Sequence, residues 1–252
     1  MDVAAKAVDS KSTIREHIWL QMERNGLVPY PLPLRGRIPN FYGSKDAAYK
    51  LCSTKEFRSA TTVKIHPSLN AEPLRYLALK FGKTVLTPPL PGHDFLYYLL
   101  NPSDIDPEHH KFAASKKGFN RLGTPCKLTE IPGVDLVVVA SVACTRQGAR
   151  VGKGKGYGEV EYGILREMEL VKRNTPIATI IHDMQVVEEQ FLPVESLSCH
   201  DVPVDIICTP TKVIRTRTHI QKPGKIFWEL ISDEMMDDIG ALKELKSLKA
   251  AQ

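Results

Sequence analysis

The sequence has no apolar run near the roughly 18 residues that a helix needs to cross a bilayer. Residues 1–12 also lack the apolar core of a secretory signal. The five cysteines include no Cys-x-x-Cys pair, which favours reduced thiols over a disulfide framework or a zinc site. These absences predict a cytoplasmic protein.

A strong charge of either sign is also missing. The formal net charge of +5 suits anionic small molecules but falls short of the basic balance of a dedicated nucleic-acid-binding domain. Hydrophobic residues make up 42% and charged residues 25% of the 252 positions, which is ordinary for a globular protein.

Strand-like and helix-like patterns alternate along most of the chain. Short apolar or β-branched runs, typical of buried strands, occupy residues 61–66, 84–87, 134–140, 176–182 and 204–209. Helical periodicity is found over residues 11–25, 44–54, 74–81 and 159–171, and from 232 onward. This alternation predicts a three-layer α/β fold with a mostly parallel sheet. We expect residues 1–10 to be disordered and residues 11–252 to form a single domain.

Two segments show no regular pattern. Residues 28–40 contain four prolines, so we expect an extended connector on the surface. Residues 92–128 are harder to interpret, and we expect a mobile loop or lid over a ligand.

The stretch from Leu136 to Gly158 contains no carboxylate. It carries five glycines and four basic residues: Gly148, Gly152, Gly154, Gly156, Gly158, Arg146, Arg150, Lys153 and Lys155. Glycines let backbone N–H groups approach a ligand, and the next helix adds the positive end of its dipole. A strand, a glycine-rich basic loop and a helix in this order predict a phosphate site. The alternative is a solvated, flexible basic turn.

The loop matches neither common nucleotide motif. It has no Gly-Lys-Ser/Thr, and its Gly-x-Gly-x-Gly spacing differs from the dinucleotide fingerprint. Because ligands of parallel sheets lie beyond the carboxyl ends of strands, we expect His182–Gln185 and Cys208–Thr209 to line the same crevice. Cys144 adjoins the loop, and we interpret it as a buried cysteine rather than a catalytic thiol.

Several motifs in order give the sequence a resemblance to the 5-formyltetrahydrofolate cyclo-ligase family. They are Lys11 with Arg15, Gly82 with Lys83, the run Arg150-Val151-Gly152-Lys153-Gly154-Lys155-Gly156-Tyr157-Gly158-Glu159, and His200-Asp201 with Val204, Asp205 and Thr209. The resemblance covers roughly residues 11–214. It implies a fold like the NagB/RpiA/CoA-transferase group.

The resemblance also implies a reaction, in which ATP with Mg²⁺ phosphorylates the formyl oxygen of 5-formyltetrahydrofolate before ring closure gives 5,10-methenyltetrahydrofolate. By this resemblance Arg150 and Tyr157 are catalytic, Glu159 binds the metal, and Ser68 and Asn70 contact the folate. The residues implied in ATP binding are Lys11, Arg15, Arg150, Gly152, Lys153, Gly154, Lys155, Gly156, Tyr157 and Gly158.

Three positions depart from the family pattern. Gly158 replaces a tyrosine, Glu159 replaces an aspartate, and Ser68 falls where the family has a glutamate that contacts the folate. Two other hypotheses therefore stay open. One is a catalytically impaired relative that binds a nucleotide or RNA. The other is a sugar-phosphate or CoA-ester enzyme on the same fold.

Overall fold

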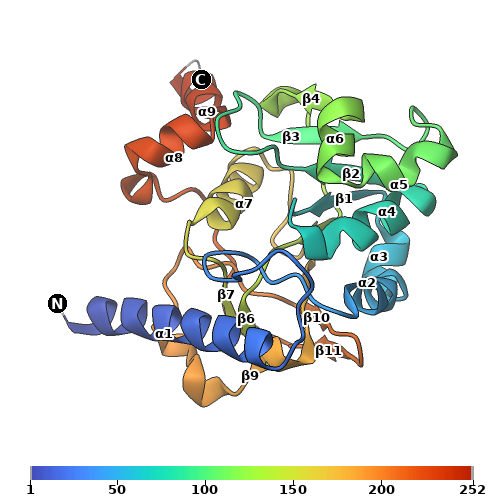
Figure 1. Cartoon of the computed structure of the whole chain (residues 1–252). Coiled ribbons are helices and arrows are strands. Elements are labelled where there is room, and N and C mark those ends of the chain that lie inside the picture. The colour runs from blue at the N-terminus through green and yellow to red at the C-terminus, as the bar shows by residue number, and fades with distance from the viewer. Residues whose placement is uncertain (1, 251–252) are drawn as a thin grey trace.

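The computed structural model describes residues 2–250 (Figure 1). Its helices are α1 (Asp2–Arg24), α2 (Ser44–Cys52), α3 (Lys55–Ser59), α4 (Glu72–Lys80), α5 (His110–Ala113), α6 (Lys116–Leu122), α7 (Tyr157–Glu167), α8 (Asp233–Asp238) and α9 (Ala241–Ala250). Its strands are β1 (Thr62–Ile65), β2 (Thr84–Thr87), β3 (Tyr97–Leu100), β4 (Thr124–Cys126), β5 (Leu136–Val138), β6 (Ala143–Thr145), β7 (Arg150–Val151), β8 (Ile177–Ile180), β9 (Val186–Val187), β10 (Ile206–Cys208) and β11 (Val213–Arg215). Within residues 2–250, none of the helices has the length and apolar character of a membrane span.

Eight strands form the main sheet in the order β11-β10-β8-β5-β1-β2-β3-β4. The five central strands, from β10 to β2, pair in parallel. Strand β11 at one edge and strands β3 and β4 at the other are antiparallel. The prediction of a mostly parallel sheet is therefore confirmed.

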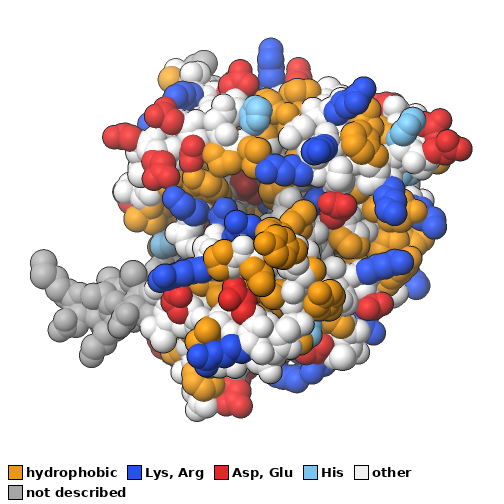
Figure 2. Space-filling model, in the orientation of Figure 1, with side chains coloured by type: hydrophobic (Ala, Val, Ile, Leu, Met, Phe, Trp, Pro, Cys, Tyr) orange, Lys and Arg blue, Asp and Glu red, His pale blue; other side chains and the backbone are white. Residues whose placement is uncertain are grey.

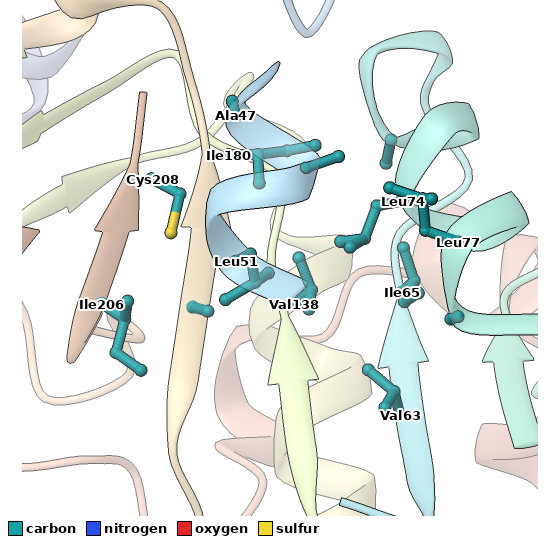
Figure 3. Close-up of a cluster of buried hydrophobic side chains, with 14 of the residues drawn as sticks. Ala47, Leu51, Val63, Ile65, Leu74, Leu77, Val138, Ile180, Ile206 and Cys208 are labelled. Atoms are coloured by element: carbon teal, nitrogen blue, oxygen red, sulfur yellow. The ribbon is translucent and has the colours of Figure 1, made fainter. Parts of the chain in front are cut away.

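Helices cover both faces of this sheet. On β1, Val63 and Ile65 point to the face covered by α2 and α4, where they pack near Leu51 and Leu74 (Figure 3). On the other face, apolar side chains of α7 and α9 form a second buried cluster with the sheet. Each fully buried leucine contributes about 1.5–3 kcal/mol, so both layers stabilise the fold. This arrangement confirms the three predicted layers.

A small second sheet is formed by β6 and β7, which lie between β5 and α7 in the sequence, together with β9. Its strands are ordered β7-β6-β9, and α1 packs against β6. The sequence predicts that the glycine-rich loop leaves the strand at residues 134–140 directly. Instead the chain first forms the β6–β7 hairpin, and the loop begins only after Val151. Strands of two or three residues are too short to show a periodicity.

The expectation of a mobile loop at residues 92–128 is wrong. This segment contributes β3 and β4 to the main sheet and forms α5 and α6. Phe95 and Phe119 pack on Tyr98, with ring centroids 4.8 and 6.0 Å from it. The elements have three to seven residues, which explains why no pattern is visible in the sequence.

Both ends of the described chain differ from expectation. Helix α1 begins at Asp2, so residues 2–10 are helical where the sequence predicts disorder. The sequence predicts one helix from residue 232 onward, but the structure has two, α8 and α9, with a break near Gly240. The Gly240 N–H donates to the carbonyl of His93 at 3.0 Å, and a Cβ at Gly240 would lie 2.6 Å from Asp94 Cα. Close backbone approach therefore requires glycine at the break.

Candidate functional site

A cavity of about 680 Å³ opens at the carboxyl ends of three adjacent parallel strands. Residues that follow β1 (66–69), β2 (88–91) and β5 (139–140) line one part of it. The glycine-rich loop (150–159) lines another part. The chain runs from β1 to β2 on one side, and β5 pairs with β1 on the other side. The cavity thus lies where the strand order reverses, the usual ligand site of such sheets.

The other two strand ends do not reach this cavity. The expectation that His182–Gln185 and Cys208–Thr209 line it is wrong. The Asp183 carboxylate accepts hydrogen bonds from the hydroxyls of Thr209 and Thr211 at 2.7 and 2.5 Å. These hydrogen bonds join the loop after β8 to the loop after β10.

Two glycines give the loop its shape. Gly154 and Gly156 have φ angles of 98° and 71°, in the left-handed region that disfavours other residues. A Cβ at Gly154 would lie 3.3 Å from Arg15 Cζ, and one at Gly156 would lie 2.6 Å from Met235 Cε. Gly156 also begins α7 without a side-chain cap. The loop therefore presents backbone and an uncapped helix start next to the cavity.

Positive charge is in excess around the cavity, as Figure 2 shows by the Lys and Arg side chains around the hollow in the middle of the view. Seven basic residues line it, namely Lys11, Arg15, Arg37, Lys64, Arg150, Lys153 and Lys155. Three carboxylates, Glu159, Glu161 and Asp201, also line it, which leaves an excess of four positive charges. Such a field favours an anionic ligand. Arg146, the other basic residue of the predicted loop, lies outside the cavity lining.

Arg150 is buried, and its side chain bonds to three groups of the protein. Its Nε donates to the Val202 carbonyl at 2.8 Å, and its Nη1 donates to the Ala140 carbonyl at 2.6 Å. Its Nη2 pairs with the Glu159 carboxylate. Arg150 thereby ties the strand end after β5 to the first turn of α7.

Arg15 and Lys11 bring α1 to the same cavity, which agrees with the position that the family resemblance implies for them. Arg15 Nε donates to the Gly152 carbonyl at 2.7 Å, and Lys11 pairs with Asp201. Burial lowers the pKa of Arg15, and the neighbouring carboxylates of Glu159 and Asp201 oppose this shift. The guanidinium is therefore a partly desolvated cation beside the loop backbone.

Helix α8 also contacts the glycine-rich loop and the first residue of α7. The Tyr157 hydroxyl donates to Asp238, and Lys155 Nζ lies 3.2 Å from Glu234 Oε1. Burial, followed by the hydrogen bond to Asp238, raises the pKa of Tyr157 to about 12. Lys153 Nζ lies 5.7 Å from the centre of the Tyr157 ring. Tyr157 is consequently a protonated phenol near neutral pH.

The two residues expected to contact a folate have different positions. Ser68 lines the cavity, but Asn70 does not. Asn70 is buried, and its Nδ2 donates to the Ile180 carbonyl at 3.2 Å. Its structural role is to join the turn after β1 to β8.

Sequence reasoning missed a buried charge pair in the cavity wall. Lys64 Nζ lies 2.5 Å from Glu161 Oε2, and the Lys64 side chain is only 3% exposed. His66, His200 and Asp201 also line the cavity. A signal for Lys64 was present, because a lysine between Val63 and Ile65 is unusual in a strand buried on both faces.

The interpretation of Cys144 as a buried cysteine is confirmed. Its side chain is fully buried, and burial raises the pKa of the thiol to about 11. A thiol with a raised pKa is mostly protonated and is a poor nucleophile near neutral pH.

Among the described residues, no three His, Cys, Asp or Glu side chains are grouped as a metal site. The predicted metal ligand, Glu159, lines the cavity at the loop end. One hard oxygen ligand of this kind suits Mg²⁺ held mainly by phosphate oxygens and water, which takes one or two protein carboxylates.

A model of the 5-formyltetrahydrofolate cyclo-ligase family matches residues 7–210. Methenyltetrahydrofolate synthase domain-containing proteins of Bos taurus and Danio rerio are 38% and 33% identical to the chain over 238 and 242 residues. These alignments cover 94% and 96% of the chain but only 62% and 63% of those relatives. The chain thus spans less than two thirds of their length.

One solved structure supports the fold. The NMR structure of Aquifex aeolicus 5,10-methenyltetrahydrofolate synthetase is similar with a TM-score of 0.50 and 23% identity. The match covers 82% of this chain and 93% of the Aquifex protein. The similarity agrees with the α/β class deduced from the sheet and its two helical layers.

Proposed function

Because the chain belongs to the 5-formyltetrahydrofolate cyclo-ligase family, we propose that it binds ATP with Mg²⁺ and converts 5-formyltetrahydrofolate, or a related heterocycle, to 5,10-methenyltetrahydrofolate. The observation that carries this proposal is the glycine-rich loop at the start of α7, in a cavity with four excess positive charges. Phosphate groups are the ligands that such a helix start and cation set favour.

The triphosphate would lie against the loop. Backbone N–H groups of residues 152–158 would bind phosphate oxygens, and the side chains of Lys11, Arg15, Lys153 and Lys155 would neutralise their charge. Arg150 is bonded to two carbonyls and to Glu159, so it would act by holding the loop in place. Tyr157 would offer a hydroxyl that stays protonated, since its pKa is about 12.

The proposed reaction transfers the γ-phosphoryl group of ATP to the formyl oxygen and leaves ADP. The folate N10 then attacks the activated formyl carbon and loses its proton. Cleavage of the carbon–oxygen bond releases the former formyl oxygen with phosphate. Phosphoryl transfer depends mainly on positioning the reactants and on stabilising negative charge. The cations around the loop would stabilise this charge.

Glu159 would hold Mg²⁺, which when bound helps to neutralise phosphate oxygens. The carboxylate lines the cavity and already faces a cation, Arg150. Its place in the first turn of α7 is the place where the family pattern has an aspartate.

The heterocycle would lie against the strand ends. Leu69, Val139 and the segment 88–91, which contains three prolines, form a mainly apolar wall. Ser68 would add a hydroxyl to this wall. Flat heterocycles fit pockets that combine apolar walls with a few polar groups.

Calorimetric titration with ATP–Mg²⁺ and, separately, with 5-formyltetrahydrofolate tests the proposal. We expect wild type to bind both, and Lys153→Ala with Lys155→Ala to weaken ATP binding about tenfold or more. Arg146→Ala is the matched control, because Arg146 lies outside the cavity lining and its loss should change ATP affinity less than about twofold. Failure of wild type to bind ATP would refute the proposal.

A second candidate function is a nucleotide-binding relative that has lost catalysis. The observation in its favour is that Ser68 replaces the family glutamate and Asn70 is turned away from the cavity. Binding of ATP without binding of the folate would identify it. RNA is not supported as a partner, because the family whose model matches the chain is a folate cyclo-ligase family.

A further inference from the structure

His66 is a buried histidine with an unusual lack of partners. It directly follows β1, lines the cavity and is 3% exposed. Neither Nδ1 nor Nε2 has a hydrogen-bond partner in the described part of the chain, and both nitrogens are buried, so the ring has to turn before one of them can meet a ligand in the cavity. Buried polar atoms are nearly always paired, so an imidazole with two unpaired nitrogens in a cavity wall calls for a ligand.

The backbone on both sides of His66 is held firmly. The His66 N–H donates to the Val138 carbonyl at 3.2 Å, which fixes it to β5. Arg75 Nη1 donates to the carbonyls of His66 and Ser68 at 2.7 and 3.2 Å. Arg75 itself donates through Nε to the Ala114 carbonyl at 2.8 Å. These contacts use only backbone atoms of His66 and leave its ring free.

The surroundings keep the ring neutral. Burial lowers the pKa of His66 well below its usual value, and the nearby charges of Arg75, Lys64 and Arg150 lower it further. A neutral imidazole has one N–H donor and one nitrogen acceptor. Through one nitrogen at a time it therefore suits an uncharged carbonyl or N–H group rather than a phosphate.

We infer that His66 is a specificity-determining residue whose ring, through one of its nitrogens, makes a hydrogen bond to an uncharged polar group of the bound heterocycle, either a carbonyl or an N–H group. The identity of the heterocycle rests on the proposed function. His66 lies on the wall formed by the strand ends, two residues before Ser68. It thus supplies a polar contact on the wall where the family's glutamate is absent.

Replacing the ring with one of similar size but without nitrogen tests this role. We expect His66→Phe to weaken binding of 5-formyltetrahydrofolate about tenfold, because a polar edge of the ligand loses its partner. ATP–Mg²⁺ affinity should change less than about twofold. His66→Gln, which keeps a donor and an acceptor, should recover part of the folate affinity.

Thermal unfolding of the unliganded variants separates this role from a structural one. His66→Phe removes two unpaired buried nitrogens, so we expect its Tm to equal or exceed that of wild type. A histidine needed for the fold would instead give a lower Tm and weaker binding of both ligands. The imidazole ¹⁵N NMR signal of His66 supplies a direct readout. This signal is identified by its absence from the spectrum of His66→Phe, and it should shift in wild type when folate is added.

Three results would overturn the inference. One is equal folate affinity in wild type and His66→Phe, which leaves the proposed function intact. Another is a loss of Tm and of both affinities in His66→Phe, with no change of the imidazole signal on adding folate to wild type. The third is binding of ATP but not of folate by wild type, which refutes the folate part of the proposed function as well.

Discussion

The buried guanidinium of Arg75 donates a hydrogen bond of 2.7 Å to the carbonyl oxygen of His66. The same side chain bonds to the Ala114 carbonyl, which follows α5. Arg75 thus connects the segment 92–128 to the cavity wall. This segment is part of the support of the site, although the sequence suggests a lid.

Arg75→Met should destabilise the protein and disturb the cavity. The change leaves buried carbonyl oxygens of His66 and Ala114 without their donor, so we expect the free energy of unfolding to fall by at least about 2 kcal/mol. Urea unfolding measures this. Arg121→Met is the control, because Arg121 is exposed on α6 and its loss should cost less than about 0.5 kcal/mol. Equal effects of the two changes would contradict the role given to Arg75.

The pair of Lys64 and Glu161 should behave as a buried ion pair. Glu161→Gln leaves the Lys64 ammonium, 3% exposed, without its counter-charge, and we expect a loss of about 3 kcal/mol in the free energy of unfolding. The double variant Lys64→Met with Glu161→Met should recover much of this loss. A double-mutant cycle in urea with Lys64→Met, Glu161→Met and their combination is the measurement, and additive single effects would show that the two side chains do not interact.

Asp238 should control the titration of Tyr157. Burial and the hydrogen bond to Asp238 raise the pKa of Tyr157 to about 12 from 10.0, so Asp238→Asn should bring it closer to 10.0. A raised pKa in the folded state contributes stability that is complete below pH 10 and is lost as the pH rises toward 12. Ultraviolet titration of tyrosinate, with Tyr157→Phe subtracted, measures the shift. An unchanged pKa in Asp238→Asn would contradict the contact.

Glu159 should determine the Mg²⁺ dependence of ATP binding. In Glu159→Gln we expect about tenfold more Mg²⁺ to be needed for half-maximal ATP affinity, because a carboxylate ligand is lost. Titration of ATP at several Mg²⁺ concentrations tests this. Glu234→Gln is the control, since Glu234 contacts the exposed Lys155 from α8 and does not line the cavity. The same Mg²⁺ requirement in wild type and Glu159→Gln would rule out Glu159 as the ligand.

The sequence predicts the central sheet well, and it singles out the glycine-rich loop that lines the cavity. Residues 136–140, which include β5, are a continuous apolar run, and the glycine-rich loop combines charge and spacing in one segment, so local patterns are sufficient. Lys11 and Arg15 were connected to that loop only through the family resemblance. Their approach to residues 152 and 201 depends on how α1 packs, which no local pattern contains.

The parts that escaped prediction depend on tertiary contacts. Asn70 was expected in the cavity, but its amide donates to the Ile180 carbonyl instead. His66 belongs to no motif in the sequence. Only the structure shows that its ring nitrogens are buried without a hydrogen-bond partner. Residues 92–128 form elements too short to show periodicity, and they are ordered by aromatic packing around Tyr98.

Formation of the methenyl product tests the central proposal most directly. Wild-type protein with 5-formyltetrahydrofolate, ATP and Mg²⁺ should give a rising absorbance at the methenyl band, with one ADP formed for each product. Omission of ATP should abolish the signal, and Arg15→Ala should reduce its rate about tenfold or more because a partly buried cation at the loop is lost. A wild-type protein that binds both ligands yet forms no product above background would contradict the proposed reaction.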